Sequence, residues 1–297
     1  MPELLAIFGP TAAGKTGVAI EVAERLRKRG EEPVAISCDA IQIYRGLEVL
    51  SGAPTAEERG RLEHRLVGTA GVGDEFSAGR FAELARTEID SLLAEGRRPI
   101  VVGGTGLYLR AALSELDLRP PVPAAVREDV ERELAERGPE AMHAELPEEQ
   151  REWVHPNDRK RIARATELSR AGIEPAPPGE RGGELWTARL RRPSLLIGLS
   201  MDREQLDARI DARVEAMAAA GAGEEARAAL KAGASRTARA ALGFDGFLAG
   251  DLEAVKTEHR RYARRQLAWM RKMGGVRVIE RSGRDDEAVA REIVSAP

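Results

Sequence analysis

An eight-residue stretch near the amino terminus carries the clearest chemistry in this sequence. It consists of Gly9, Pro10, Thr11, Ala12, Ala13, Gly14, Lys15 and Thr16. This is the G-x-x-x-x-G-K-[ST] pattern of a phosphate-binding loop, and it stands between an apolar run at 4–8 and a helical pattern at 17–29. The glycines let several backbone N–H groups face one anion, Lys15 supplies a cation, and the Thr16 hydroxyl can join the shell of Mg²⁺. We therefore predict a strand, a phosphate-binding loop and a helix, in that order.

Asp39 is the second candidate, because it follows an apolar run at 34–38 that is typical of a buried strand. In an open parallel sheet, ligands bind at the carboxyl ends of the strands, so Asp39 and the phosphate loop should face one crevice. A carboxylate there can act as a general base or a partner of Mg²⁺, or it can be an ordinary turn residue. Gln42 can read the edge of a nucleobase with its amide, or it can be a surface polar residue.

A third candidate segment is Gly103-Gly104-Thr105, which ends a predicted strand at 100–102. Many phosphate-loop ATPases carry an acidic residue there to hold Mg²⁺, so the glycines argue against a motor-type ATPase. Two glycines allow close approach of a ligand to the backbone, and Thr105 offers a hydroxyl at the mouth. The alternative is a tight turn into a helix with Thr105 as its cap.

Cations cluster in two helical patterns outside these motifs. The first, at 158–170, begins with Arg159, Lys160, Arg161 and Arg164. The second, at 253–272, carries Arg260, Arg261, Arg264, Arg265, Arg271 and Lys272 beside a stripe of Tyr262, Gln266, Trp269 and Met273. We expect the stripe to pack on the core and the cations to face solvent or an anion. Either cluster can contact nucleic-acid phosphates or be simply a solvated face.

Arg209 and Arg213 lie one helical turn apart in a pattern that spans 203–219. Such a pair can clamp a diphosphate. The alternative is a surface held by salt bridges with Asp207 and Asp211.

These residues require an α/β scaffold to position them. Strand patterns at 4–8, 34–38, 100–102, 195–199 and 276–279 alternate with helical ones, which predicts a P-loop NTPase-like parallel sheet with helices on both faces. The middle of the chain shows charged helical patterns without a strand, between two proline-rich segments. We predict an α/β core formed by 1–116 and 193–297, the latter with the C-terminal helices, and an all-helical insertion domain at 117–192.

Composition excludes several classes. The chain has 297 residues with 46 basic and 49 acidic side chains, so overall charge does not indicate a nucleic-acid partner. The single cysteine, Cys38, suits a reducing compartment, and the four histidines show no metal-ligand spacing. No apolar run approaches the roughly 18 residues of a membrane span. We expect a cytoplasmic protein that does not bind membranes.

Taken together, the motifs resemble those of the tRNA dimethylallyltransferase family. The matching segments are 9–16, 39–44, 103–108, His155-Pro156-Asn157-Asp158 with Arg161 and Arg164, and 264–271. The phosphate loop is shared by many enzymes, whereas its internal Pro-Thr, the D-x-x-Q-x-Y segment and G-G-T-x-L-Y are far more specific in combination. The chain departs from the family at Ala40, where serine is common and a polar contact to RNA is lost, and in the proline- and glycine-rich stretch 173–186.

The resemblance implies transfer of a dimethylallyl group from dimethylallyl diphosphate to N6 of adenine 37 in tRNAs that read codons beginning with U. Catalysis would rest on Asp39 as the base, Thr11 as an orienting hydroxyl, and Lys15 and Arg213 at the leaving diphosphate. The loop 9–16 and Arg209 would complete the diphosphate site, with Mg²⁺ on Thr16.

The same resemblance implies RNA contacts in both parts of the chain. They are assigned to Asp39, Ala40, Ile41, Gln42, Thr105, Arg127, Lys160, Arg161 and Arg164. The implied partners are the tRNA anticodon stem-loop and dimethylallyl diphosphate, the cofactor is Mg²⁺, and we expect a monomer. Adenine 37 would be flipped out of its stack to reach the crevice.

Three other functions fit part of the sequence. A P-loop small-molecule kinase would use the loop for ATP, but it leaves the insertion and the basic C-terminal helix unexplained. An adenylate isopentenyltransferase shares the chemistry but takes a free nucleotide, which needs no stem-gripping domain at 117–192. A nucleotide-gated RNA-binding adaptor without catalytic activity is the third.

Overall fold

The chain divides into two compact units, each of which is described by itself. The computed structural model describes residues 3–116, 118–173 and 185–295. Met1–Glu115 and Trp186–Pro297 form the first unit, and Leu116–Leu185 form the second. Residues 186–192, which we expected in the insertion, thus belong to the first unit. Most of the stretch 173–186 lies outside the described residues.

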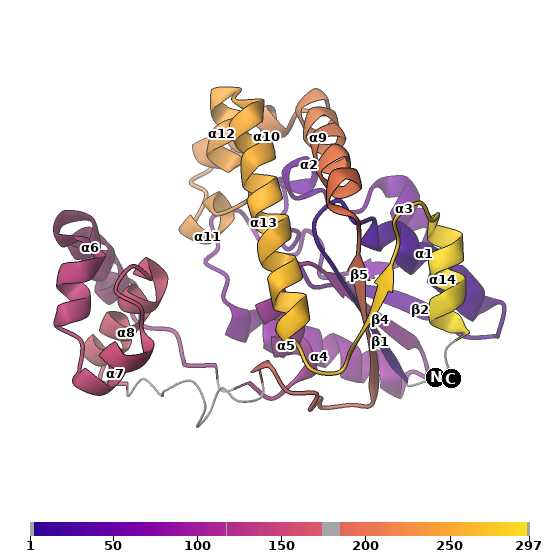
Figure 1. The fold of residues 1–297 in the computed structure, drawn as a ribbon, viewed down its shortest axis with the longest axis horizontal. Helices are drawn as coiled ribbons and strands as arrows, with labels where there is room; N and C mark the ends of the chain where they lie inside the picture. Colours follow the sequence, from indigo (N-terminus) through magenta and orange to yellow (C-terminus); the bar gives the residue numbers. More distant parts are fainter. Residues whose placement is uncertain (1–2, 117, 174–184, 296–297) are drawn as a thin grey trace. The chain divides into compact units, whose positions relative to one another are not determined.

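A six-stranded parallel sheet forms the centre of the first unit (Figure 1). The strands are β1 (Leu4–Phe8), β2 (Pro33–Ser37), β3 (His64–Arg65), β4 (Arg98–Gly103), β5 (Ser194–Ser200) and β6 (Val276–Glu280). Their order in the sheet is β3-β2-β4-β1-β5-β6. The parallel sheet and all five predicted strands are confirmed, and β3 is the strand that the sequence did not indicate.

Helices cover both faces of the sheet, as predicted (Figure 1). The helices of the first unit are α1 (Lys15–Arg27), α2 (Glu48–Ser51), α3 (Ala56–Arg61), α4 (Ala78–Ala94), α5 (Gly106–Leu113), α9 (Arg203–Ala219), α10 (Ala222–Lys231), α11 (Arg236–Arg239), α12 (Phe244–Ala249), α13 (Leu252–Lys272) and α14 (Asp286–Val294). Alternate residues of β1 enter different cores: Leu5 and Ile7 pack with α1 and α14, whereas Phe8 packs with the layer that contains α4, α5, α9 and α13.

The strand order brings three loops side by side. Because β4 lies between β1 and β2, the segment after β4 stands between the phosphate loop and Asp39. All three segments follow the carboxyl ends of parallel strands, where ligands bind in open α/β sheets. The topology therefore gathers the predicted residues of the first unit at one edge.

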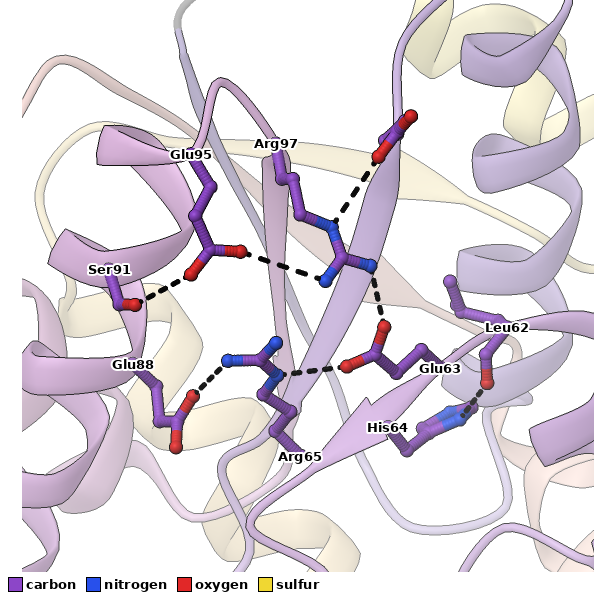
Figure 2. Close-up of polar contacts among 9 residues, drawn as sticks. Leu62, Glu63, His64, Arg65, Glu88, Ser91, Glu95 and Arg97 are labelled. Atoms are coloured by element: carbon purple, nitrogen blue, oxygen red, sulfur yellow. Dashed lines mark hydrogen bonds and ion pairs between the residues drawn. The ribbon is translucent and has the colours of Figure 1, made fainter.

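A charged network occupies the opposite end of the sheet (Figure 2). Arg97 pairs with Glu63 at 2.5 Å, while Arg65 pairs with Glu63 at 2.9 Å and with Glu88 at 2.6 Å. These pairs connect α4 with the beginnings of β3 and β4. Partly exposed pairs of this kind contribute little stability each.

The second unit consists of α6 (Ala124–Ala144), α7 (Glu148–Trp153) and α8 (Arg159–Arg170). Its small core contains Val130, Leu134, Met142, Leu146, Val154, Ile162 and Ala165. Helix α6 kinks at Gly138, which has non-helical backbone angles. No strand occurs at 118–173, as predicted. Among the described residues of the whole chain, no helix is long and apolar enough to cross a membrane.

Candidate active site

The phosphate loop runs from the end of β1 into α1, which begins at Lys15, two residues earlier than predicted. Gly14 adopts the left-handed region with φ 76°, and Ala12 does so with φ 62°, a strained value for a residue with a Cβ. The Ala13 N–H donates to the Pro10 carbonyl at 3.2 Å and closes the turn. The N–H groups that begin α1 have no partners within the helix and form the positive end of its dipole.

Lys15 is close enough to Arg213 and Asp39 for their charges to influence its ionisation. Burial, the largest cause, and the charge of Arg213 together lower its pKa to about 8, although the charge of Asp39 opposes the shift. The Lys15 ammonium donates to the Pro10 carbonyl at 2.8 Å. The sequence prediction that Lys15, Asp39 and Arg213 share one site agrees with this mutual influence.

Arg213 reaches the site from α9. Burial lowers its pKa, and the charges of Asp39 and Glu58 oppose that shift. Its Nε is buried without a hydrogen-bond partner among the described residues. A Cβ on Gly52 would overlap its guanidinium, so the side chain needs this glycine beside it.

Arg209, one turn earlier on α9, donates from Nε to the Ala12 carbonyl at 2.8 Å. The alternative of surface salt bridges for this arginine pair is wrong. Asp211 pairs with Arg260 at 2.5 Å, and Asp207 faces Arg203 at 3.8 Å. Both arginines therefore point toward the phosphate loop side of their helix.

Asp39 stands at the carboxyl end of β2 and is partly exposed. Its Oδ1 accepts the N–H of Ile41 at 3.0 Å, so one oxygen has the turn role that we considered as an alternative. No hydrogen bond to Oδ2 occurs within the described part of the chain. That oxygen is available to accept a proton.

Thr105 connects β4 with two other segments. It occupies the cap position of α5, but its side chain does not cap that helix, so the simple cap interpretation is wrong. Its hydroxyl accepts the Ala40 N–H at 3.4 Å and lies 3.4 Å from the Tyr262 hydroxyl of α13. Burial raises the pKa of Tyr262 to about 12.

Gln42 has its amide engaged within the protein. Nε2 donates to the Gly52 carbonyl at 3.2 Å, and Oε1 accepts the Ser37 hydroxyl at 2.7 Å. It thereby fixes the loop that carries Ala40 and Ile41, both of which are partly exposed. Reading a base with this amide would require one of these bonds to be exchanged.

Gly103 and Gly104 make room for the protein itself. A Cβ on Gly103 would overlap the Cys38 carbonyl, and one on Gly104 would overlap the amide of Gln266. We expected a ligand to lie close to these glycines, but the Cys38 carbonyl and the Gln266 amide fill that space instead. The glycines therefore allow β2, β4 and α13 to meet.

Gln266 is a site residue that the sequence did not reveal, because it stands in a stripe interpreted as packing. It is buried; Oε1 accepts the Thr11 N–H at 2.8 Å, and Nε2 donates to the Gly104 carbonyl at 2.8 Å. One amide thus connects the phosphate loop to the turn after β4. A polar residue inside an apolar stripe was the available signal.

A polar hollow of about 300 Å³ lies beside α13. Its lining residues are Arg239, Ala240, Ala241, Leu242, Phe244, Asp245, Glu258, Arg261 and Arg265. The Arg265 guanidinium also lies 5.4 Å from the centre of the Tyr262 ring, which contacts Thr105. Five of the six predicted cations of α13 are exposed, as expected, whereas Arg260 is half-buried and pairs with Asp211.

Residues 42–273 match the model of a protein family described as IPP transferase. The chain belongs to the IPP transferase family. A tRNA dimethylallyltransferase of Anaeromyxobacter sp. (strain Fw109-5) is 40% identical over 94% of this chain and 95% of the relative. One of Thermobifida fusca (strain YX) is 39% identical over 92% of this chain and 88% of the relative.

Solved structures of related proteins share the fold. The full-length tRNA isopentenylpyrophosphate transferase from Bacillus halodurans is 29% identical, with a TM-score of 0.69 over 99% of this chain and 94% of that chain. A eukaryotic dimethylallyltransferase acting on tRNA has a TM-score of 0.73 over 93% of this chain and 73% of its own, and its 24% identity supports the fold alone. The α/β fold predicted for this IPP transferase family member is confirmed.

The cations of the insertion lie in the second unit. Lys160 and Arg161 are exposed at the start of α8, and the Arg161 Nε lies 3.5 Å from the Asp158 carboxylate. Arg164 is more engaged: it pairs with Glu167 at 3.2 Å and donates to the carbonyls of Arg119 and Pro120 at 3.2 and 2.8 Å. Arg127 is half-buried on α6 and also has an interaction within the protein.

Few of the described side chains could hold the Mg²⁺ ion that we expected from the sequence. No group of three His, Cys, Asp or Glu side chains gathers around a point within the described residues. Mg²⁺ often binds through one or two protein groups together with substrate phosphates and water. The partly exposed Thr16 hydroxyl at the start of α1 fits that mode, and an all-protein cage does not.

Proposed function

We propose that this protein transfers a dimethylallyl group from dimethylallyl diphosphate to N6 of adenine 37 in tRNAs that read codons beginning with U. One observation carries the proposal: Lys15 and Arg213 lie within electrostatic reach of Asp39, beside a phosphate loop. A cationic leaving-group site and a carboxylate base are the two parts that this substitution reaction requires. The tRNA dimethylallyltransferases to which the chain is similar support it.

The leaving diphosphate would be held by the phosphate loop. As the bond between its oxygen and the allylic carbon breaks, negative charge grows on that oxygen. The N–H groups at the start of α1 would bind the diphosphate, Lys15 would turn to it from the Pro10 carbonyl, and Arg213 would donate from its unpaired nitrogen. When bound, Mg²⁺ supplies further neutralising charge, and the Thr16 hydroxyl would be its protein ligand.

Asp39 would serve the attacking amine. The N6 lone pair forms the new bond to the allylic carbon, and the carboxylate accepts the N6 proton at the oxygen that has no hydrogen bond. The Thr11 hydroxyl would orient the two reactants, because Gln266 fixes the backbone of Thr11. Arg209 would support the loop from Ala12 and contact the diphosphate with its remaining donors.

RNA recognition would use both units. Exposed Lys160 and Arg161, with Arg127 and Arg164, would contact the anticodon stem. In the first unit, the flipped adenine would enter beside Ala40, Ile41, Gln42 and Thr105. We further propose that the protein works as a monomer in the cytoplasm.

The two enzymatic alternatives predict other acceptors. A small-molecule kinase leaves the insertion without a role, although the family match extends through it. An adenylate isopentenyltransferase needs no cationic helix in a separate unit. Both remain distinguishable by product.

A single assay tests the proposal. The protein is incubated with dimethylallyl diphosphate, Mg²⁺ and either an anticodon stem-loop with A37, the same stem-loop with G37, or AMP. We expect prenylated adenine in the A37 stem-loop alone. Prenylated AMP would favour the free-nucleotide enzyme, and ATP hydrolysis without prenyl transfer would favour the kinase.

A further inference from the structure

Arg281 is a buried arginine that the proposed chemistry does not use. It follows β6 and is only 3% exposed. Its Nη1 donates to the Ala13 carbonyl of the phosphate loop, and its Nη2 pairs with the Asp286 carboxylate at 2.7 Å. A long cationic side chain is thus fixed between the loop and α14.

The bond to Ala13 determines which way one peptide group faces. The carbonyl of Ala13 and the N–H of Gly14 belong to the same trans peptide, so they point in opposite directions. With the carbonyl held by Arg281, the Gly14 N–H faces away from Arg281. Arg209 holds the preceding carbonyl, that of Ala12, in the same way.

Asp286 fixes Arg281 and compensates its charge. A Cβ on Gly17 would overlap the Asp286 carboxylate, so that carboxylate lies directly on the first turn of α1. The Arg281–Asp286 pair is neutral as a unit, unlike Lys15 and Arg213. The pair therefore contributes to anion binding by orienting the phosphate loop, and it adds no net positive charge to the site.

We infer that Arg281, held by Asp286, is a positioning residue that keeps the Gly14 N–H turned toward the bound diphosphate. The inference rests on the proposed function for its substrate, because it assigns a diphosphate to this loop. Without Arg281, the Ala13 carbonyl loses its partner and the peptide can rotate. The loop would then bind the diphosphate with fewer aligned donors while the acceptor side stays unchanged.

The experiment compares R281M and R281K with a matched control, R284M. Arg284 lies on the same turn and also donates to backbone carbonyls, those of Glu280 and Ala288, but away from the loop. The Kd for inorganic diphosphate is measured by calorimetry, and the KM values for dimethylallyl diphosphate and the A37 stem-loop are measured in the transfer assay.

We expect R281M to raise the Kd for diphosphate and the donor KM about tenfold, the equivalent of one hydrogen bond involving a charged group. The stem-loop KM should stay within about twofold, R281K should recover part of the loss, and R284M should bind as the wild type does. D286N, which keeps the shape of its side chain, should show a smaller increase. Unchanged diphosphate affinity in folded R281M, or an equal loss in R284M, would overturn the inference.

Failure of the proposed function is a separate result. If the wild-type protein binds diphosphate but does not prenylate the stem-loop, the reaction is wrong, and the calorimetric comparison still decides the role of Arg281. If the wild type prenylates and R281M binds diphosphate normally, only the inference fails.

Discussion

Replacing Arg213 with methionine should make the free protein more stable and weaken its binding of diphosphate. The Arg213 Nε is buried without a partner among the described residues, and an unpaired buried donor costs about 1–3 kcal/mol. Methionine keeps the unbranched stem, removes the unpaired donor and relieves Lys15 of a like charge. The attraction of Asp39 for Arg213 is lost and offsets part of this gain. We therefore expect the free energy of unfolding to rise by about 1 kcal/mol, or about 3 °C in Tm.

The cost should appear in the substrate complex. R213M loses a charged donor to the diphosphate, so its Kd for diphosphate should rise about 10- to 100-fold. Urea unfolding gives the first quantity and calorimetry with inorganic diphosphate gives the second. R203M is the control, since Arg203 lies on the same helix but is exposed and has only a long ion pair with Asp207. A loss of more than about 1 kcal/mol of stability with unchanged diphosphate affinity would show that Arg213 is a structural residue.

Three further predictions concern the remaining charged groups. D39A should reduce the single-turnover rate about 100-fold or more, with diphosphate binding largely retained, and an unchanged rate would exclude Asp39 as the base. K160A with R161A should raise the stem-loop KM and flatten its salt dependence with little change in kcat. An unaltered salt dependence would show that these two side chains only face solvent and do not contact RNA. Diphosphate affinity should weaken as pH rises through about 8, where unliganded Lys15 loses its proton. The midpoint of this pH dependence should move to higher pH in R213M, because the charge of Arg213 lowers the pKa of Lys15. An identical midpoint in R213M and the wild type would show that Arg213 does not influence Lys15.

Local patterns predicted most of the scaffold. The strands at 4–8 and 195–199 are continuous apolar runs, and the helix at 203–219 has apolar residues at helical spacing. The structure has all three elements within a residue of their predicted bounds. Strand β3 escaped because two residues, His64 and Arg65, cannot show a period. The alternation of strands and helices predicted a parallel sheet with Asp39 and the loop at one edge, whereas the order of the strands is known only from the structure.

Contacts between distant residues could not be predicted in the same way. Gln266 lies 255 residues from Thr11, and its amide stands in a stripe that otherwise packs. Arg281 lies 268 residues from Ala13, within a polar turn that resembles any surface turn. The ion pair of Asp211 was also hidden, because this residue lies two positions from Arg213 in the sequence but pairs with Arg260 of another helix. Sequence spacing predicts which residues share a helix face, and only the fold decides what that face meets.

The fastening of the phosphate loop by Gln266 and Arg281 has a consequence for synthesis on the ribosome. The loop is among the first segments to emerge, yet the groups that hold it are made some 250 residues later. Contacts of such sequence separation form late, because the intervening chain must be ordered first. The nascent protein should reach its full diphosphate affinity only after α14 has left the exit tunnel. Stalled chains that lack α13 and β6 would carry the whole motif and still bind diphosphate poorly.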